Sequence, residues 1–254
     1  MAPPAVQFAE VSASRGGRPV LRQVSLSVAA GQTVALVGRS GSGKTTLLRL
    51  VNRLLDPDSG DVLVDGLSTR AWNPVDLRRR TGYVIQDAGL FPHVTVAGNI
   101  ATVPRLLEWP SARIEARVDE LLTLVGLDPA VFRGRWPDQL SGGQRQRAGL
   151  ARALAADPPL LLMDEPFGAL DPITKGELHA EFQRVQRTLH RSVILVTHDM
   201  AEACLLADQI AVLHDGEVIA CDTPANVVAA NDVRVTSLFG ELRLQPEATP
   251  RVNP

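Results

Sequence analysis

GRSGSGKT, residues 38–45, is the stretch that decides the fold. It fits the pattern GxxxxGK[ST], and it lies between an apolar β-rich run, Thr33–Val37, and a helical pattern over Thr45–Leu55. Glycines let successive backbone N–H groups converge on phosphate oxygens, and a helix N-terminus adds its positive dipole end. A Gly/Ser-rich turn is the alternative. The strand before the loop and the helix after it favour a phosphate-binding loop.

The side chains of this loop carry the chemistry. Lys44 is predicted to place a positive charge beside the β- and γ-phosphates of a nucleotide, and the Thr45 hydroxyl to ligate Mg²⁺. Lysine occurs only at Lys44 and Lys175, so its presence here is more informative than usual. The predicted nucleotide contacts are Gly38, Arg39, Ser40, Gly41, Ser42, Gly43, Lys44, Thr45 and Thr46.

A second apolar run, Leu160–Met163, ends in the carboxylates Asp164 and Glu165. Alone, this pattern is equally typical of an ordinary strand end. In a chain with a phosphate-binding loop, Asp164 is predicted to hold Mg²⁺ through water. Glu165 is then predicted to polarise the attacking water as general base.

LSGGQ, residues 140–144, predicts another helix N-terminus suited to phosphate. The chain already has one phosphate-binding loop, and a monomer with one nucleotide does not need a second. A capped helix start with no further role is the alternative.

Composition restricts the partners. The chain has 254 residues, 45% of them hydrophobic and 21% charged, which makes a packed core feasible. Its net charge of −2 argues against general affinity for nucleic acid or anionic lipid, so no nucleic-acid partner is expected. The sequence shows no secretory signal and no apolar run near the ~18–20 residues that span a bilayer. Cys204 and Cys221 fit no metal spacing and are expected to be buried free thiols.

The order of elements predicts an interrupted α/β core. Strands are predicted at Val6–Val11, Val24–Val28, Thr33–Val37, Asp61–Val64, Gly82–Ile85, Leu160–Met163, Ser192–Val196, Gln209–Leu213 and Glu217–Ala220. The last two flank Asp215-Gly216, a hairpin signal. Core segments are therefore assigned to 1–87 and 158–231, and a loosely ordered tail to 232–254.

Between these core segments, residues 88–157 are predicted to form a helical subdomain. Apolar residues from Ile114 to Val125 recur at helical spacing, with Ser111 as the predicted N-cap. Beyond the subdomain, Asp171 and Pro172 predict the cap and first position of a later helix.

These motifs, in this order, resemble the nucleotide-binding domain of ABC transporters over nearly the whole chain. The resemblance implies an α/β fold: a P-loop NTPase core of the ABC type with an antiparallel β subdomain and an inserted α-helical subdomain. It also implies ATP and Mg²⁺ as cofactors. In that family, the LSGGQ loop of one subunit closes on the γ-phosphate bound by the partner's P-loop. Ser141, Gly142, Gly143 and Gln144 would then act in trans, in a dimer with a second copy.

The resemblance assigns further residues. Gln86 falls in the loop that senses Mg²⁺ and the attacking water, and Ala169-Leu170-Asp171 in the loop that reaches across the dimer. His198 would be the switch histidine that touches the γ-phosphate. A lone histidine is more often a capping or core residue, but its register with the other motifs favours the switch. Without such support, His93, His179, His190 and His214 are interpreted as structural or surface residues.

One position departs from the family pattern. The family usually places an aromatic residue before the second strand to stack on adenine, and Arg15 stands there in this chain. A guanidinium can also stack on a π-face, so Arg15 is a candidate adenine contact.

Longer segments resemble the ATPases of importers for glycine betaine, choline, carnitine or proline betaine. They are GYVIQDAGLFPHVTVAGNI, PRLLEWPSARIEARVDELLTLVGLDP and EPFGALDPITK. This resemblance implies a peripheral subunit at the cytoplasmic face of the cell membrane. Its partners would be integral membrane permease subunits and, indirectly, a substrate-binding protein.

Other assignments were weighed. ATPases of amino acid, polyamine or similar importers remain open, because this subunit does not touch the cargo. Soluble ABC ATPases usually carry two cassettes or a long coiled-coil insertion, and exporters are mostly fused to membrane spans. A non-hydrolysing cassette should lack Glu165 or His198, and both are present. About thirty residues follow the last predicted strand, so regulation by a pair of C-terminal domains is not expected from this sequence.

Overall fold

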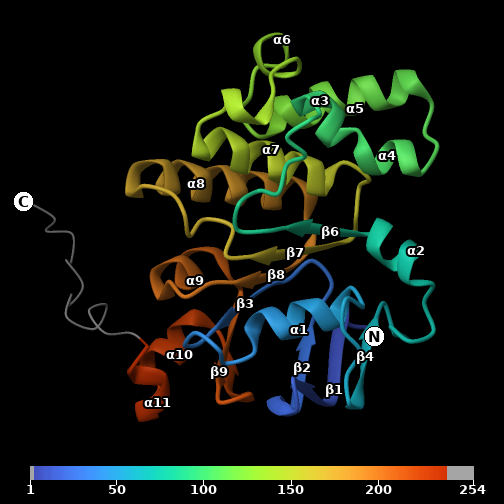
Figure 1. The fold of residues 1–254 in the computed structure, drawn as a ribbon. Coiled ribbons are helices and arrows are strands. Elements are labelled where there is room, and N and C mark those ends of the chain that lie inside the picture. The colour runs from blue at the N-terminus through green and yellow to red at the C-terminus, as the bar shows by residue number, and fades with distance from the viewer. Residues whose placement is uncertain (1–2, 239–254) are drawn as a thin grey trace, which may run out of the picture.

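The computed structural model describes residues 3–238 and contains two sheets with helices around them (Figure 1). The strands are β1 (Val6–Arg15), β2 (Arg18–Val28), β3 (Thr33–Val37), β4 (Ser59–Val64), β5 (Leu67–Ser68), β6 (Thr81–Val84), β7 (Leu160–Asp164), β8 (Ser192–Val196), β9 (Gln209–His214) and β10 (Glu217–Asp222). The helices are α1 (Lys44–Val51), α2 (Pro74–Arg79), α3 (Val96–Ile100), α4 (Thr102–Leu106), α5 (Ser111–Leu124), α6 (Pro129–Phe132), a 3₁₀ turn (Pro137–Gln139), α7 (Gly142–Leu154), α8 (Pro172–Leu189), α9 (Met200–Leu206), α10 (Pro224–Ala229) and α11 (Val233–Thr236).

The larger sheet brings the predicted motifs to one edge. Its strand order is β10-β9-β3-β8-β7-β6, with parallel pairing except between β9 and β10. Every residue of β3 and β8 is buried, which explains why both read as continuous apolar runs. The loops that follow β3, β7 and β8 therefore leave the same edge of the sheet, the usual ligand edge of a parallel sheet.

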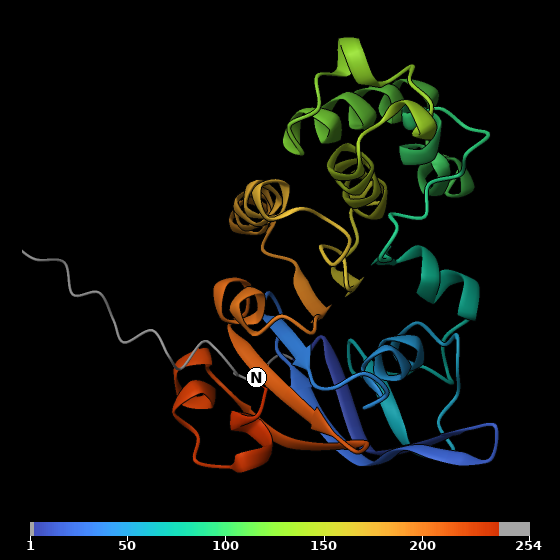
Figure 2. The same cartoon turned by 60° about the vertical axis from the view of Figure 1, so that its left-hand side comes forward.

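The smaller, antiparallel sheet has the order β2-β1-β4-β5 and packs against the same core. A single hydrophobic cluster joins Phe8 of β1, Leu36 of β3 and Leu47 of α1. Helix α1 lies between this sheet and the parallel one (Figure 2). Its buried side chains belong to a cluster with residues of both sheets. This packing holds the loop at residues 38–43 rigidly at the sheet edge.

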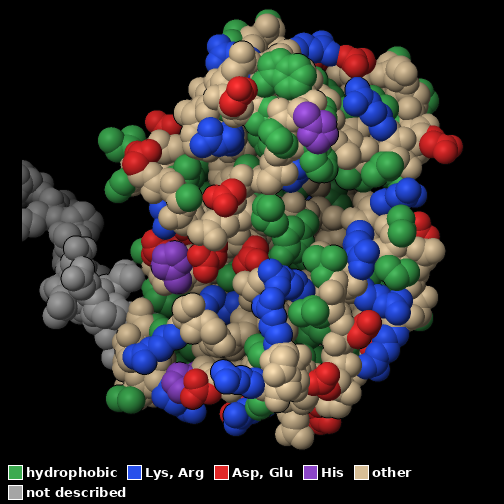
Figure 3. Space-filling model, viewed as in Figure 1, with side chains coloured by type: hydrophobic (Ala, Val, Ile, Leu, Met, Phe, Trp, Pro, Cys, Tyr) green, Lys and Arg blue, Asp and Glu red, His purple; other side chains and the backbone are tan. Residues whose placement is uncertain are grey.

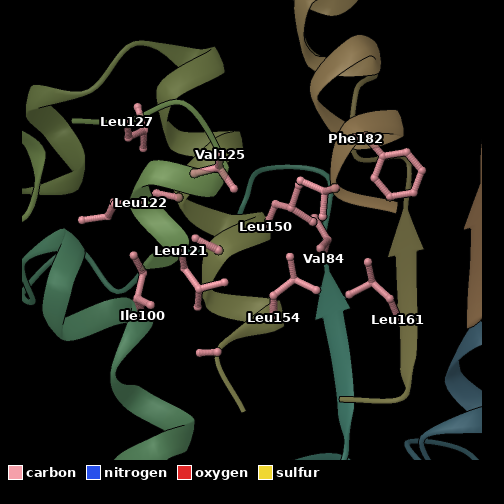
Figure 4. Close-up of a cluster of buried hydrophobic side chains, with 14 of the residues drawn as sticks. Val84, Ile100, Leu121, Leu122, Val125, Leu127, Leu150, Leu154, Leu161 and Phe182 are labelled. Carbon is pink, nitrogen blue, oxygen red and sulfur yellow. The ribbon is translucent and has the colours of Figure 1, made fainter. Parts of the chain in front are cut away.

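The helical segment between β6 and β7 packs against the sheet through α7 and shares its core. Figure 4 shows Leu121 of α5, Leu150 of α7 and Phe182 of α8 around Val84 of β6 and Leu161 of β7. All five belong to one buried cluster. The helices therefore cover one edge of the sheet with a continuous apolar interior.

The chain end that the structure describes is anchored by a third cluster. Val227 of α10 and Val235 of α11 are each 1% exposed and pack with Val212 of β9. The prediction of a loosely ordered tail from residue 232 is therefore wrong for α11, because Val235 buries its side chain against the sheet. The remainder of that predicted tail, 239–254, lies outside the described residues.

Several local predictions need correction. Ser111 does not cap α5: it is the first helical residue, and Pro110 holds the cap position without a side-chain hydrogen bond. Helix α1 ends at Val51 instead of Leu55, because Arg53 turns the backbone to φ 52°. Both cysteines are free, but Cys221, near the end of the edge strand β10, is an exposed residue and Cys204 is only partly buried.

Other predictions are confirmed. The hairpin at Asp215-Gly216 joins β9 to β10, and Asp171 caps α8 with Pro172 as its first residue. No helix within residues 3–238 combines the length and apolar character needed to cross a bilayer.

Candidate nucleotide site

The loop between β3 and α1 requires glycine at two positions where side chains would collide. A Cβ on Gly38 would overlap the carbonyl oxygen of Leu213, and one on Gly43 would lie 2.5 Å from Leu21 Cδ2. Gly43 also occupies the N-cap of α1, with no side chain capping the free N–H groups. An uncapped helix start of this kind is a natural anion site.

Lys44 is held inside this loop. Its side chain is buried, and Nζ donates to the carbonyl oxygens of Gly38 (2.7 Å) and Arg39 (3.0 Å). Burial lowers the Lys44 pKa, while Glu165 and Asp164 act in the opposite direction. The ammonium therefore lies in a site where a further negative charge would stabilise it.

Ser42 supports an anion at the same place. Its Oγ is buried and has no hydrogen-bond partner among the described residues. A buried hydroxyl without a partner costs about 1–3 kcal/mol. A phosphate oxygen in the loop would supply the missing acceptor.

Thr45 and Asp164 meet from different elements, with Thr45 Oγ1 donating to Asp164 Oδ1 at 3.0 Å. The pKa of Asp164 is raised, chiefly by burial, although the Thr45 hydrogen bond lowers it. Residues 3–238 contain no group of three or more His, Cys, Asp and Glu side chains able to hold a metal by themselves. A hydroxyl and one carboxylate instead fit Mg²⁺, which takes few protein ligands and completes its shell with water and phosphate.

Tyr83 belongs to this site, although the sequence analysis did not identify it. Burial, followed by the charge of the nearby Asp164, raises the pKa of Tyr83 to about 12, while Arg49 acts in the opposite direction. The parallel pairing of β6 with β7 sets Val84 beside Met163 and so brings Tyr83 near the end of β7. No local motif signals this contact, because it depends on which strands pair.

Glu165 and His198 also come together from neighbouring strand ends. His198 Nδ1 lies 3.4 Å from Glu165 Oε2, with the two side chains 63% and 30% exposed. The Glu165 backbone N–H donates to the carbonyl of Val196, 3.0 Å away, which fixes the loop after β7 against β8. A carboxylate and an imidazole in this arrangement can together orient a water molecule and accept its proton.

A cavity of about 290 Å³ gathers these groups. It is lined by Arg15, Val20, Ser40, Gly41, Gly43, Lys44, Thr45, Thr46 and Glu165. Arg15 therefore lines the same hollow as the phosphate-binding loop, and its contact with adenine stays a prediction. On the face shown in Figure 3, acidic and basic side chains lie close together across the middle of the molecule.

Other predicted residues line a different hollow. A cavity of about 280 Å³ is bordered by Gln86, Asp87, Gly142, Arg145, Gln146, Ala169 and Leu170. None of the residues 141–144 lines the Lys44 cavity of the same chain. Gln86 likewise does not line that cavity, and its carbonyl accepts from Gln146 Nε2 at 3.0 Å.

The start of α7 is built as a capped helix. Ser141 Oγ accepts from the Gln144 N–H (3.2 Å), and Gln144 Oε1 accepts from the Ser141 N–H (3.0 Å). A Cβ on Gly143 would lie 2.5 Å from Thr174 Cγ2, so glycine allows α7 to approach α8 here. Asp171 caps α8 by accepting from the Thr174 N–H at 3.1 Å.

Comparison with known proteins decides the family. The ABC transporter family model matches residues 21–168. The glycine betaine uptake system ATP-binding protein YehX of Escherichia coli is 48% identical over 94% of this chain and 78% of its own length. The chain belongs to the ABC transporter family. The resemblance inferred from the motifs is thereby confirmed.

Further members of the family are similar over most of the chain. The choline transport ATP-binding protein OpuBA of Bacillus subtilis is 47% identical over 94% of this chain. The glycine betaine/carnitine/choline transport ATP-binding protein OpuCA of the same organism is 48% identical over 91%. This chain spans 62% and 60% of the lengths of these two curated relatives.

Solved structures confirm the fold of an ABC cassette. CbiO1 from Clostridium perfringens, part of the cbiONQ complex, has a TM-score of 0.82 at 28% identity, covering 95% of this chain and 96% of that one. The dimeric post-hydrolysis state of the ATP-binding cassette MJ0796, bound to ADP and Pi, has a TM-score of 0.76 at 31% identity. It covers 86% of this chain and 98% of the MJ0796 chain.

Proposed function

We propose that this ABC cassette binds and hydrolyses ATP to drive an importer. The observation that carries the proposal is the convergence of Lys44, Thr45, Asp164 and Glu165 at one sheet edge, beside the unpaired Ser42 hydroxyl. Each of these groups has a known role in phosphoryl transfer. A simple Gly/Ser-rich turn would not explain why these side chains come together from separate strands.

We assign the roles as follows. Lys44 neutralises the β- and γ-phosphates, and Thr45 and Asp164 would hold Mg²⁺, with Gln86 joining them when the dimer closes. The bound cation would supply charge stabilisation at the phosphoryl oxygens. Glu165 accepts the proton of the attacking water.

His198 acts beside that base. Its imidazole lies near Glu165 and would orient the water and contact the γ-phosphate. Closing of the site would exclude bulk water and strengthen each of these interactions.

The site is completed by a second copy. The start of α7 borders a hollow that is separate from the Lys44 cavity, which supports a role for Ser141–Gln144 in trans. Two copies would sandwich two ATP molecules, with Asp171 of each reaching across. The dimeric MJ0796 cassette with ADP and Pi supports this arrangement.

We further propose a division of labour along the chain. Segments 1–87 and 158–231 form the ATPase core, and 88–157 passes the motion of the dimer to integral membrane permease subunits. The subunit would lie peripherally at the cytoplasmic face of the cell membrane. A substrate-binding protein would deliver the cargo.

Quaternary-amine osmoprotectants are the proposed cargo. Relatives at 47–48% identity are described as choline, glycine betaine or carnitine transport proteins. A sulfate/thiosulfate import ATP-binding protein, CysA of Mycobacterium bovis, is 45% identical over 89% of this chain. Another importer cargo is therefore the second candidate.

The decisive experiment is reconstitution with the cognate permease in liposomes. ATPase activity should rise when binding protein loaded with glycine betaine, choline or carnitine is added, and sulfate should serve as the matched comparison. If sulfate stimulated the ATPase activity and none of the quaternary amines did, sulfate would replace them as the proposed cargo. Absence of ATP hydrolysis under every condition would contradict the ATPase assignment itself.

A further inference from the structure

A cluster of charged side chains lies between α8 and α9 and does not line the Lys44 cavity. Lys175 Nζ lies 2.6 Å from Asp199 Oδ2 and 3.0 Å from Glu202 Oε2. Glu202 has a side chain only 2% exposed, and its Oε2 lies 3.3 Å from His179 Nε2. Figure 2 shows the two helices next to each other on one side of the sheet. The Lys175 ammonium of α8 thus bridges two carboxylates at the start of α9, those of Asp199 and Glu202.

Lys175 lies close to the loop expected to reach the partner. Its backbone N–H donates to the carbonyl of Asp171 at 2.9 Å, in the first turn of α8. Asp171 itself caps that turn. Lys175 therefore belongs to the same first helical turn that Asp171 caps, directly after this loop.

Asp199 connects the cluster to His198, which directly precedes it. One carboxylate oxygen, Oδ1, accepts from the N–H groups of Ala201 (2.9 Å) and Glu202 (3.1 Å) at the start of α9. The other, Oδ2, accepts from Lys175. Because the Asp199 N–H also donates to Thr197 Oγ1 at 3.0 Å, the turn that carries His198 is fixed on both sides.

His179 connects the same cluster to the Glu165 loop. Its ring meets the Phe167 ring edge-on, with centroids 4.8 Å apart and an interplanar angle of 87°. Phe167 is buried and follows Glu165 by two positions. The loops after β7 and β8 and the start of α8 are thus all linked to the buried Glu202 carboxylate.

Electrostatics requires the cation at this position. An ionised carboxylate as buried as Glu202 is stable only with a charged, hydrogen-bonded partner. Burial lowers the pKa of Lys175, but its hydrogen bonds and the charges of Asp199 and Glu202 outweigh this and raise it. Burial raises the pKa of Asp199, and Lys175 reverses this to a net lowering. The pair therefore stays ionised in the physiological range.

We propose that Lys175 is a positioning residue: by bridging Asp199 and Glu202, it sets the His198 turn against Glu165 and against the Asp171 loop. It touches no nucleotide and acts through His198. The proposal rests on the ATPase function proposed above. It assigns a task to the only lysine outside the phosphate-binding loop.

The test is a kinetic comparison in the full chain. Lys175→Met should lower kcat by about 10- to 100-fold, because a small misplacement of a catalytic group has effects of this size. KM for ATP should change by less than about threefold, since the phosphate-binding loop is intact. Lys175→Arg should restore kcat to within about threefold, because a guanidinium can also bridge two carboxylates. A KM effect without a kcat effect would overturn the proposal.

A matched control on the same helix separates positioning from general stability. Arg184 pairs with Glu181, is 60% exposed and lies away from the three loops. Arg184→Met should leave kcat unchanged. If it lowers kcat as much as Lys175→Met does, the effect is one of helix stability and the proposal fails.

The route through His198 can be tested with a double variant in single-turnover assays. In a His198→Ala background, Lys175→Met should lower the rate by less than about twofold further, because its effect is already lost. An equal fold-loss in both backgrounds would show that Lys175 acts independently and would refute the proposal.

Hydrogen–deuterium exchange without nucleotide gives a readout independent of hydrolysis. Exchange over residues 197–203 should rise in Lys175→Met and stay unchanged in Arg184→Met and Lys175→Arg. Unchanged exchange in Lys175→Met would overturn the proposal. If the wild-type chain hydrolyses no ATP, the proposed function fails, while this measurement still decides the role of Lys175.

Discussion

Glu165 has a backbone φ of 48°, in the left-handed region that few residues other than Gly, Asn and Asp adopt. Such a conformation costs on the order of 1–3 kcal/mol and persists only where the surroundings impose it. Here the Glu165 N–H donates to the carbonyl of Val196, and the carboxylate lies 3.4 Å from His198 Nδ1. Strain at this residue is consistent with a general base whose direction matters more than its local stability.

Arg15 yields a prediction at the same scale. Arg15→Ala should weaken ATP binding by about 2- to 10-fold, the range expected for loss of a cation–π or stacking contact. Isothermal titration with ATP and with tripolyphosphate measures this, and tripolyphosphate binding should not change. Arg18, exposed and opposite Arg15 in the β1–β2 hairpin, is the matched control. Equal effects of Arg15→Ala and Arg18→Ala would remove Arg15 from the site.

Lys44 should contribute more to nucleotide affinity than Arg15 does. Lys44→Ala should weaken the binding of both ATP and tripolyphosphate by about 10-fold or more, because charge-assisted hydrogen bonds to phosphate are lost. A variant with near-normal ATP and tripolyphosphate affinity would contradict the role proposed for Lys44.

Tyr83 is the only tyrosine in the chain, so an absorbance titration of phenolate reports it alone. Its pKa is raised from 10.0 to about 12 by burial and by Asp164. The folded chain should therefore show little phenolate at pH 10, whereas the denatured chain should be half ionised there. The stability contributed by this group is complete below pH 10 and is lost as the pH rises to 12. A folded-state midpoint near pH 10 would contradict the contact with Asp164.

At the scale of elements, the start of α7 depends on close packing against α8. The role proposed for this helix start in trans needs it exposed toward a partner and fixed toward its own chain. Gly143 provides the second property, because a Cβ there would lie 2.5 Å from Thr174 Cγ2, whereas a Cβ on Gly142 would make only an ordinary contact, 3.6 Å from Leu170 Cδ2. Adjacent glycines therefore have different structural tasks.

Gly143→Ala should lower the free energy of unfolding by about 1–3 kcal/mol, because the added methyl overpacks the contact with Thr174. Gly142→Ala should cost less than about 1 kcal/mol. The double variant Gly143→Ala with Thr174→Ser removes Thr174 Cγ2 and should recover most of the loss. Denaturant unfolding measures all three. Equal destabilisation by the two alanines would refute this packing account.

At the scale of the whole molecule, the Lys44 cavity and the cavity beside the start of α7 are separate, and in the proposed dimer each would be one half of a shared site. Closing a dimer around ATP brings the halves together only if the partner's α7 start meets the phosphate-binding loop. Hydrolysis would then release the contact, which makes dimer lifetime a direct measure of the chemistry.

Glu165→Gln should accumulate as an ATP-bound dimer, because the amide keeps the shape of the side chain and cannot accept the proton. Light scattering after size exclusion, with ATP and Mg²⁺, should show about twice the monomer mass. Adding Ser141→Arg should block dimer formation while ATP affinity of the monomer is retained, since the bulky side chain lies on the face proposed for the partner. A Glu165→Gln chain that binds ATP and stays monomeric would contradict the shared site.

The sequence alone determined the parts whose geometry is local. The phosphate-binding loop of residues 38–45 and the capped start at LSGGQ are formed within a few residues, so spacing and residue type predict them. Asp164 and Glu165 follow a recognisable buried strand. The predicted N-cap of α5 is wrong by one position, because Pro110 takes the cap position and Ser111 is the first helical residue.

Only the tertiary structure decided which of these parts meet. The pairing of β6 with β7 brings Tyr83 to Asp164, and the packing of α8 on α9 joins Lys175 to Glu202. Such contacts join residues far apart in the chain. Their partners are set by strand order and helix packing, which depend on the burial of whole surfaces, and no short motif encodes that choice.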